Sequence, residues 1–475
     1  MSRTNVKRGT RTTARVARAT EVAAPAVSPK VAEVTAARVK PRAANGPGKV
    51  LLISLFHPEL VRGGAQQVAY ELFEGLKEVP GCEPVLLAAI DQSFPALYKS
   101  GARITGFDGR HNEYIYLSAE YDYLWHKTSS ALHLAAVEEF LLTIRPDVIH
   151  FHHFLAMGVD WLTLVRRVLP DARIIFTFHE FLSICHADGH MVRKTDRSLC
   201  TRASQVRCHQ CFPNLAPEHF LLRRLWFHRH LSAADMYTCP SKFMIEHYVE
   251  FGIPPDRMRH VTNGQRNQAV AVAGKPQPGL KRRFGFFGQF VDVKGVRVLL
   301  QAVALLRAEG ITGFSVDLNG DNLRYASEAA RTEIETFLAE EAALPAETRI
   351  VHNNGSYEVS QLAARMARVD WCIVPSVWWE IFGLVISEAW MFGKPVICSN
   401  AGGMKERVAD DLNGLHFQLG DAASLARVMH RAMSEDGLWE RLNANLPKPP
   451  PREVMVRGYL DAYAEAAVAR GVAVE

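Results

Sequence analysis

The chain has 475 residues, enough for two or three domains that each bury a core, which excludes a single small binding module. Hydrophobic residues make up 48% and charged residues 22%, a globular composition that excludes a wholly disordered chain and a fibrous repeat. The formal net charge is +5, but residues 1–50 hold eleven Lys or Arg and two Asp or Glu, so the rest of the chain is net acidic. This distribution argues against nucleic acid as a partner of the folded body.

Residues 1–47 are rich in Ala, Val, Thr, Arg and Pro and offer few large apolar side chains to bury, so we predict that they form a disordered basic arm. An Arg-rich transit peptide is the alternative. The sequence shows neither the apolar core of a secretory signal nor an apolar run long enough to span a bilayer. We therefore expect a cytoplasmic protein, and peripheral attachment to the inner face of a membrane stays open.

The sequence changes character after this arm. Residues 49–54 form an apolar run typical of a buried strand, Gly63 and Gly64 indicate a turn, and the apolar spacing that follows predicts a helix. Helical stretches such as 130–144 then alternate with further short apolar strands. These strands are expected at 84–89, 147–151, 173–178, 236–239 and 258–261. Strands that alternate with helices predict a parallel, doubly wound sheet.

A second series of the same kind follows residues 265–280, which contain Pro and Gly and are interpreted as a linker. Its strands are expected at 283–287, 315–318, 349–351, 371–374 and 395–398, and its helices at 296–308, 358–368, 384–392 and 422–434. We therefore predict two doubly wound domains. They cover 48–264 and 281–447, and a final helix covers 453–475.

Residues 375–395, with the sequence PSVWWEIFGLVISEAWMFGKP, are the most informative segment. Glu380 follows a predicted strand and Glu388 lies about one turn into the next helix, with Gly383 between them. Glycine lets the backbone approach a ligand, and the amides at a helix N-terminus attract anions. Two carboxylates beside such a site suit a ligand with both phosphate and sugar hydroxyls, whereas the structural alternative is a surface loop with two solvated glutamates.

Further motifs stand in order along the chain. They are Gly63-Gly64, His179-Glu180, Ser241-Lys242, Asn263-Gly264, Gly288, Lys294-Gly295, the segment with Glu380 and Glu388, and Gly402-Gly403 with Glu406. In this order the motifs make residues 49–470 resemble the retaining nucleotide-sugar glycosyltransferases of family 4. The resemblance implies the GT-B fold, in which two Rossmann-like domains face each other across a cleft, and a last helix that crosses back to the N-terminal domain.

The resemblance also implies roles for individual residues. Glu380 is expected to contact the donor sugar, Glu388 the nucleotide ribose, and His179 the sugar near its reacting carbon. Lys294 is expected to neutralise the diphosphate as the bond to the sugar breaks, so that a cation replaces a metal. The expected catalytic residues are His179, Glu380 and Lys294. The expected donor-binding residues are Gly63, Gly64, Gly288, Gln289, Lys294, Phe382, Gly383, Leu384 and Glu388.

One position departs from the family pattern. The family usually has an arginine after the glycine of the strand-end turn, whereas Gln289 follows Gly288 here. Glutamine donates hydrogen bonds without a charge. We therefore expect weaker stabilisation of the leaving diphosphate, or a substitute cation, for which Arg407 is a candidate.

Histidines follow two of the predicted strands. His179 comes directly after the predicted strand over 173–178, in the run RIIFTFHE, and thus at the carboxyl end of a strand, where doubly wound folds hold their ligands. His150, His152 and His153 lie at the end of another predicted strand. Successive strand residues point to opposite faces, so we interpret these three as structural or acceptor-lining residues rather than as a metal site.

Residues 182–215 form an unusually long connection inside the N-terminal domain, and a structureless loop of this length is uncommon in a compact domain. Cys185, Cys200, Cys208 and Cys211 suit a tetrahedral structural zinc, with free thiols and disulfides as the alternatives. No cofactor is expected for the chemistry itself. Residues 220–230, FLLRRLWFHRH, predict a helix that lies on an anionic membrane or packs on its own domain.

The sequence thus predicts an α/β protein with two Rossmann-like domains. Its expected function is retaining, metal-independent transfer of a hexose-type sugar from a nucleotide diphosphate sugar to a hydroxyl acceptor. That acceptor is expected in polysaccharide, lipopolysaccharide or glycolipid assembly, and a lipid-linked glycan is one candidate. A GT-B-type nucleotide-sugar epimerase or hydrolase, and a non-catalytic scaffold, are the alternatives.

Overall fold

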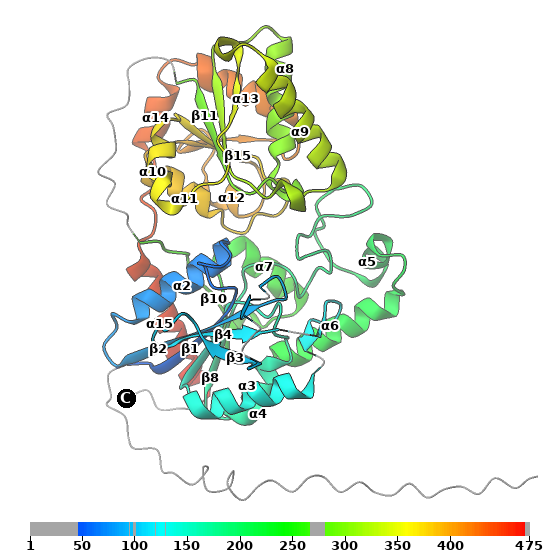
Figure 1. Ribbon diagram of the computed structural model, residues 1–475, viewed down its shortest axis with the longest axis vertical. Helices are drawn as coiled ribbons and strands as arrows, with labels where there is room; N and C mark the ends of the chain where they lie inside the picture. The colour runs from blue at the N-terminus through cyan, green and yellow to red at the C-terminus, as the bar shows by residue number, and fades with distance from the viewer. Residues whose placement is uncertain are drawn as a thin grey trace, which may run out of the picture. The chain divides into compact units, whose positions relative to one another are not determined.

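Two parallel β-sheets organise the protein, for which we describe a computed structural model (Figure 1). The structure describes residues 46–94, 96–97, 101–118, 120–128, 130–266 and 281–470. The predicted arm over 1–47 lies outside these ranges except for its last two residues, and most of the predicted linker over 265–280 also lies outside them. Helices separate most strands of both sheets, which confirms the predicted α/β class.

The first sheet has eight strands in the order β10-β9-β8-β7-β1-β2-β4-β3, and only the edge strand β3 is antiparallel. The strands are β1 (Gly48–Leu55), β2 (Cys82–Ile90), β3 (Ile104–Gly106), β4 (Glu113–Leu117), β7 (Val148–Phe151), β8 (Arg173–Thr177), β9 (Met236–Cys239) and β10 (Met258–His260). The helices are α2 (Gly64–Leu76), α3 (Ala131–Ile144), α4 (Trp161–Val168), α5 (Gln205–Cys211), α6 (Pro217–Leu231) and α7 (Lys242–Phe251). A separate two-stranded ribbon pairs β5 (Tyr121–Asp122) with β6 (Lys127–Thr128).

Strand β1 shows why its sequence is continuously apolar. Leu51 and Ile53 belong to the core on one face of the sheet, and Val50 and Leu52 to the core on the other. Side chains of a strand alternate between faces, so a strand covered on both faces needs apolar residues throughout.

The second sheet has six parallel strands in the order β13-β12-β11-β14-β15-β16. They are β11 (Arg283–Phe287), β12 (Ser315–Asn319), β13 (Val351–Asn353), β14 (Trp371–Val374), β15 (Val396–Ser399) and β16 (Gly414–Phe417). The helices are α8 (Val296–Ala308), α9 (Glu328–Ala343), α10 (Val359–Ala367), α11 (Leu384–Met391), α12 (Gly402–Arg407), α13 (Ala422–Ser434) and α14 (Leu438–Ala444). A short 3₁₀ turn, η3 (Asp292–Lys294), follows β11.

The last helix, α15 (Arg452–Ala469), packs on the first sheet rather than on the second (Figure 1). Its Tyr459 and Tyr463 are fully buried in the same core as Val50 and Ile175. The residues that the structure describes all belong to one compact unit. Among the helices that the structure describes, none is long and apolar enough to cross a bilayer.

Candidate functional site

Two loops of the second sheet meet at its carboxyl edge. Lys294 ends η3 after β11, Glu380 follows β14, and the Lys294 Nζ donates to Glu380 Oε2 at 2.7 Å. Gly295 makes this approach possible, because its φ is +74° and a Cβ there would lie 1.8 Å from the carbonyl oxygen of Pro375. The structure therefore brings together two of the three residues that the sequence predicts to be catalytic.

The carboxylate of Glu380 is buried and held by three side-chain donors. Besides Lys294, Ser376 Oγ donates to Oε2 at 3.2 Å and Trp378 Nε1 donates to it at 3.1 Å. Burial by itself raises the pKa of Glu380, but the charge and hydrogen bond of Lys294, with the other two donors, outweigh it and hold the pKa below its ordinary value. Glu380 is therefore ionised at neutral pH and fixed in one orientation.

Glu388 has a different environment, although it lies on the helix that begins just after Glu380. Its side chain is half-buried in α11 and makes no hydrogen bond or ion pair with another described residue. Burial raises the pKa of Glu388 to about 7, and the charge of Arg62 opposes this shift only in part. A half-buried carboxylate without a protein partner is able to accept hydrogen bonds from a ligand.

Arg407 supports the N-terminus of α11. Gly383, at φ +70°, is the cap residue of this helix, and Arg407 Nη1 donates to the carbonyl oxygens of Phe382 and Gly383 at 3.0 Å each. Its Nη2 donates to Ser387 Oγ at 2.7 Å, and its guanidinium lies 3.7 Å from the centroid of the Phe382 ring. Because the guanidinium of Arg407 uses these hydrogen bonds to hold the loop and the first turn of α11, the structure does not favour Arg407 as a substitute cation for binding the phosphate.

The other residues that the sequence predicts to bind the sugar donor differ in their surroundings. A Cβ on Gly64 would lie 3.4 Å from Leu384 Cδ1, so the start of α2 lies against the start of α11. Gly63 is the cap residue of α2. Gly288 N donates to a neighbouring strand at 3.0 Å, and Gln289 is exposed, with no hydrogen bond among the described residues.

Two motifs whose role the sequence leaves open, Gly402-Gly403-x-x-Glu406 and Ser241-Lys242, meet in the structure. Gly403 N donates to the carbonyl oxygen of Glu380 at 2.7 Å, and a Cβ on Gly403 would lie 2.0 Å from the backbone of the next residue in that loop. The carboxylate of Glu406 accepts from the amides of Lys242 at 3.0 Å and Phe243 at 2.8 Å. Glu406 therefore caps α7 from α12.

Replacing Glu406 by alanine is expected to lower the free energy of unfolding by about 1 kcal/mol, because two amides of the first turn of α7 lose their acceptor. Glu335→Ala serves as the matched control, since Glu335 is an exposed helical glutamate without an ion pair to a described residue. Urea unfolding of both variants measures the difference. Equal midpoints for the two variants would show that the contact contributes nothing.

His179 is half-buried and lies in a row with the buried side chains of His152 and His150. Its Nε2 is 3.0 Å from His152 Nδ1, and their rings stack with centroids 5.3 Å apart. His150 completes the row and bonds to Tyr463 Oη of α15 at 2.8 Å. Burial lowers the pKa of His179 to about 3, so the ring is neutral at pH 7. The sequence placed His152 and His179 at the ends of two different strands but gave no sign that His152 holds His179.

The cysteine-containing segment, residues 182–215, contacts the loop of Glu380. Trp379 Nε1 donates to the carbonyl oxygen of Cys200 at 3.0 Å, and the ring of His190 lies 5.3 Å from that of Trp378. Sequence reasoning missed both tryptophans as contact residues. Their adjacency to Glu380 was the available signal.

The zinc prediction for this segment is not supported. The described residues contain no group of three or more His, Cys, Asp or Glu side chains that could hold a metal ion. Burial raises the pKa values of three of the four thiols, that of Cys185 to about 11, which favours the protonated thiol over the thiolate that metals require. The four cysteines of the segment, Cys185, Cys200, Cys208 and Cys211, are all free.

Two Rossmann-like parallel-sheet domains, with a glycine-initiated helix and an ion pair at the carboxyl edge of the second sheet, define the GT-B class. Residues 62–265 match the family described as Glycosyltransferase Family 4, and residues 272–448 match Glycosyl transferases group 1. The chain belongs to the family 4 glycosyltransferases.

Curated relatives are similar over part of their length. The D-inositol 3-phosphate glycosyltransferase of Mycobacterium leprae (strain Br4923) is 27% identical over 274 residues, 56% of each chain, so this chain matches little more than half of it. Among solved structures, Anabaena Alr3699/HepE in complex with UDP has a TM-score of 0.61 at 17% identity and covers 88% of this chain and 99% of its own. The lipopolysaccharide outer core galactosyltransferase WaaB has a TM-score of 0.54 at 15% identity and covers 87% and 98%. These structures share the fold.

Proposed function

We propose that this chain is a retaining hexosyltransferase that moves a sugar from a nucleoside diphosphate sugar to a hydroxyl acceptor. The observation that carries the proposal is the Lys294–Glu380 pair beside the N-terminus of α11, with the Glu388 side chain one turn further on bonded to no other described residue. A cation and helix amides suit a diphosphate, and two carboxylates suit the hydroxyls of a sugar and a ribose. These groups complement the parts of such a donor.

The proposed reaction breaks the bond between the anomeric carbon and the diphosphate oxygen. The acceptor oxygen forms its bond on the same face of the sugar, and the acceptor proton passes to the departing phosphate. Lys294 stabilises the negative charge that develops on the diphosphate, and Glu380 orients the sugar. The UDP in the HepE complex and the galactosyltransferase name of WaaB support a nucleotide-sugar donor and a role in polysaccharide, lipopolysaccharide or glycolipid assembly.

Thermal-shift measurements with a panel of nucleoside diphosphate sugars test the donor site, because a ligand that binds only the folded state raises its apparent stability. We expect one base and sugar to raise the melting temperature most. The product of that donor is then analysed for transfer to an acceptor with the anomeric configuration retained. Transfer to water alone would favour a hydrolase, and conversion of the free nucleotide sugar into an isomer would favour an epimerase. The absence of any thermal shift would favour a scaffold.

Donor affinity is expected to rise as the pH increases from about 6 to about 8. Burial raises the pKa of Glu388 to about 7, and only its ionised form accepts hydrogen bonds through both oxygens. Glu388→Gln is expected to bind the donor more weakly and without this pH dependence. Calorimetric titrations of both proteins at several pH values measure it, and an unchanged slope in the variant would assign the titration to another group.

A further inference from the structure

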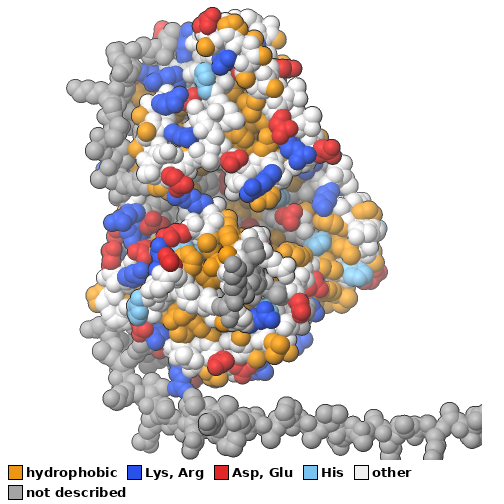
Figure 2. Space-filling view, viewed as in Figure 1, with side chains coloured by type: hydrophobic (Ala, Val, Ile, Leu, Met, Phe, Trp, Pro, Cys, Tyr) orange, Lys and Arg blue, Asp and Glu red, His pale blue; other side chains and the backbone are white. Residues whose placement is uncertain are grey.

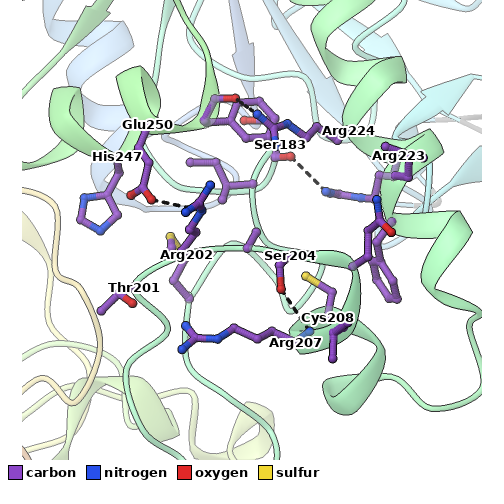
Figure 3. Close-up of a pocket in the computed structure, with 18 residues that line it drawn as sticks. Ser183, Thr201, Arg202, Ser204, Arg207, Cys208, Arg223, Arg224, His247 and Glu250 are labelled. Carbon is purple, nitrogen blue, oxygen red and sulfur yellow. Dashed lines mark hydrogen bonds and ion pairs between the residues drawn. The ribbon is translucent and has the colours of Figure 1, made fainter.

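A cavity of about 740 Å³ lies outside the donor site, among the cysteine-containing segment, α6 and α7 (Figure 3). Its volume is in the range of small-molecule sites. None of the residues predicted to bind the donor lines it. The cavity therefore needs an explanation of its own.

The lining is strongly basic. Arg202, Arg207, Arg223 and Arg224 line the cavity, and Glu250 is the only acidic residue among the described lining residues. Figure 3 shows these arginines coming from both sides of the opening. An excess of three positive charges favours an anionic ligand.

The arginines differ in how much of their charge is available. Arg223 is buried and donates to carbonyl oxygens of the same domain, so its role is structural. Arg224 donates to the carbonyl oxygen of Phe251 at 3.0 Å, and Arg202 lies 3.3 Å from Glu250. Arg207 is exposed and forms no ion pair with a described residue; Figure 3 shows its guanidinium extended along the cavity. Among the described arginines of the lining, Arg207 is thus the one whose guanidinium is not already held by hydrogen bonds or an ion pair.

Apolar surface continues from the cavity to the outside. Phe220, Leu221 and Phe251 form part of the wall, and Leu221 is 40% exposed. Val206 of α5 also lines the cavity and is 63% exposed. Figure 2 shows hydrophobic side chains at the surface over α5 and α6, on the right of the view. A ligand with an acidic head and an apolar chain matches this combination of charge and exposed apolar area.

We propose that this cavity binds the phosphorylated head of an amphiphilic acceptor, with the phosphoryl group on Arg207 and the apolar chain along Leu221 and Val206. The inference rests on the proposed function and adds the chemical class of the acceptor. His247 also lines the cavity, and its ring lies 5.8 Å from that of Trp379, which directly precedes Glu380. An acceptor held here lies beside the loop that orients the donor.

Isothermal titration with dodecyl phosphate, below its micelle concentration, tests the site without any transfer reaction. We expect saturable binding that is at least about tenfold tighter than that of inorganic phosphate or the uncharged dodecyl maltoside. Arg207→Gln is expected to weaken it by about tenfold or more, because a charged hydrogen bond to phosphate is lost. Arg229→Gln is the matched control, since Arg229 is an exposed arginine of α6 that does not line the cavity.

The apolar part is tested by a second pair of variants. Leu221→Asn is expected to weaken binding of dodecyl phosphate several-fold without affecting inorganic phosphate, whereas Leu222→Asn, outside the cavity, has little effect. Equal affinity for phosphate and dodecyl phosphate would show that the apolar chain adds nothing to binding, and would overturn the proposal of an amphiphilic ligand. A third outcome is binding that appears only with anionic phosphatidylcholine–phosphatidic acid vesicles and that Arg207→Gln leaves unchanged. It would show that the protein binds a membrane surface and that the cavity is not the binding site.

The thermal shift with nucleoside diphosphate sugars separates this proposal from the proposed function. Arg207→Gln is expected to leave that shift unchanged. If no nucleotide sugar binds, the transferase proposal fails while the dodecyl phosphate titration still gives its own answer.

Discussion

Replacing Lys294 by alanine is expected to lower the rate of sugar transfer by about 10²–10³-fold, because the cation that stabilises the departing diphosphate is removed. The loss is expected mainly in kcat, since the charge on the leaving group grows as the bond to the sugar breaks. Single-turnover kinetics with the donor identified by thermal shift measure the chemical step directly.

Lys405→Ala, at an exposed position on α12, is the control for the loss of a positive charge near the site. It is expected to keep near wild-type kinetics. Equal losses in the two variants would indicate a general electrostatic effect instead of a specific contact.

The same substitution changes how stability depends on pH. Because Lys294 depresses the pKa of Glu380, the pair stabilises the fold above the ordinary pKa of a glutamate, and this contribution is lost as the pH falls through the depressed value. In Lys294→Ala, only the hydrogen bonds of Ser376 and Trp378 still oppose the effect of burial, so the pKa of Glu380 rises relative to the wild type and this variant loses less stability on acidification. Urea unfolding of both proteins at pH values from about 4 to about 8 measures how the free energy of unfolding of each depends on pH.

The strands that are buried on both faces are among those that the sequence predicted correctly. Residues 283–287 and 371–374 form β11 and β14 with the predicted bounds, because an apolar run between two helical layers has one stable solution. The missed strands are β3, β4, β16 and the two strands of the ribbon, β5 and β6. Each is short and contains polar residues or glycine, and β3 and β16 lie at sheet edges, where pairing rather than composition decides the conformation.

The candidate site was predictable in its parts but not in its connections. The motif segment predicted Gly383 as the start of a helix, and the structure shows it as the cap residue of α11. The pairing of Lys294 with Glu380 spans 86 positions, and only the tertiary fold defines it. The cysteine spacing allowed a metal site, but spacing does not specify whether thiols converge, and here they do not form a metal-binding group.

Gly295→Ala is expected to disrupt the donor site strongly. Its Cβ would lie 1.8 Å from the carbonyl oxygen of Pro375, so the loops that carry Lys294 and Glu380 must separate. The backbone conformation adds about 1 kcal/mol, since φ is +74° and alanine disfavours this region. We expect a total loss of more than about 3 kcal/mol in the free energy of unfolding, with little donor binding left.

Gly310→Ala separates these two causes. Gly310 has nearly the same φ, +76°, but no atom lies within 4 Å of the position of its Cβ. It is therefore expected to lose only the conformational part, about 1 kcal/mol, and to keep the thermal shift with the donor. Urea unfolding and donor titration of both variants compare them. Similar losses at the two positions would mean that the loops of Lys294 and Glu380 move apart easily, and that their contact is made by the donor rather than by the fold.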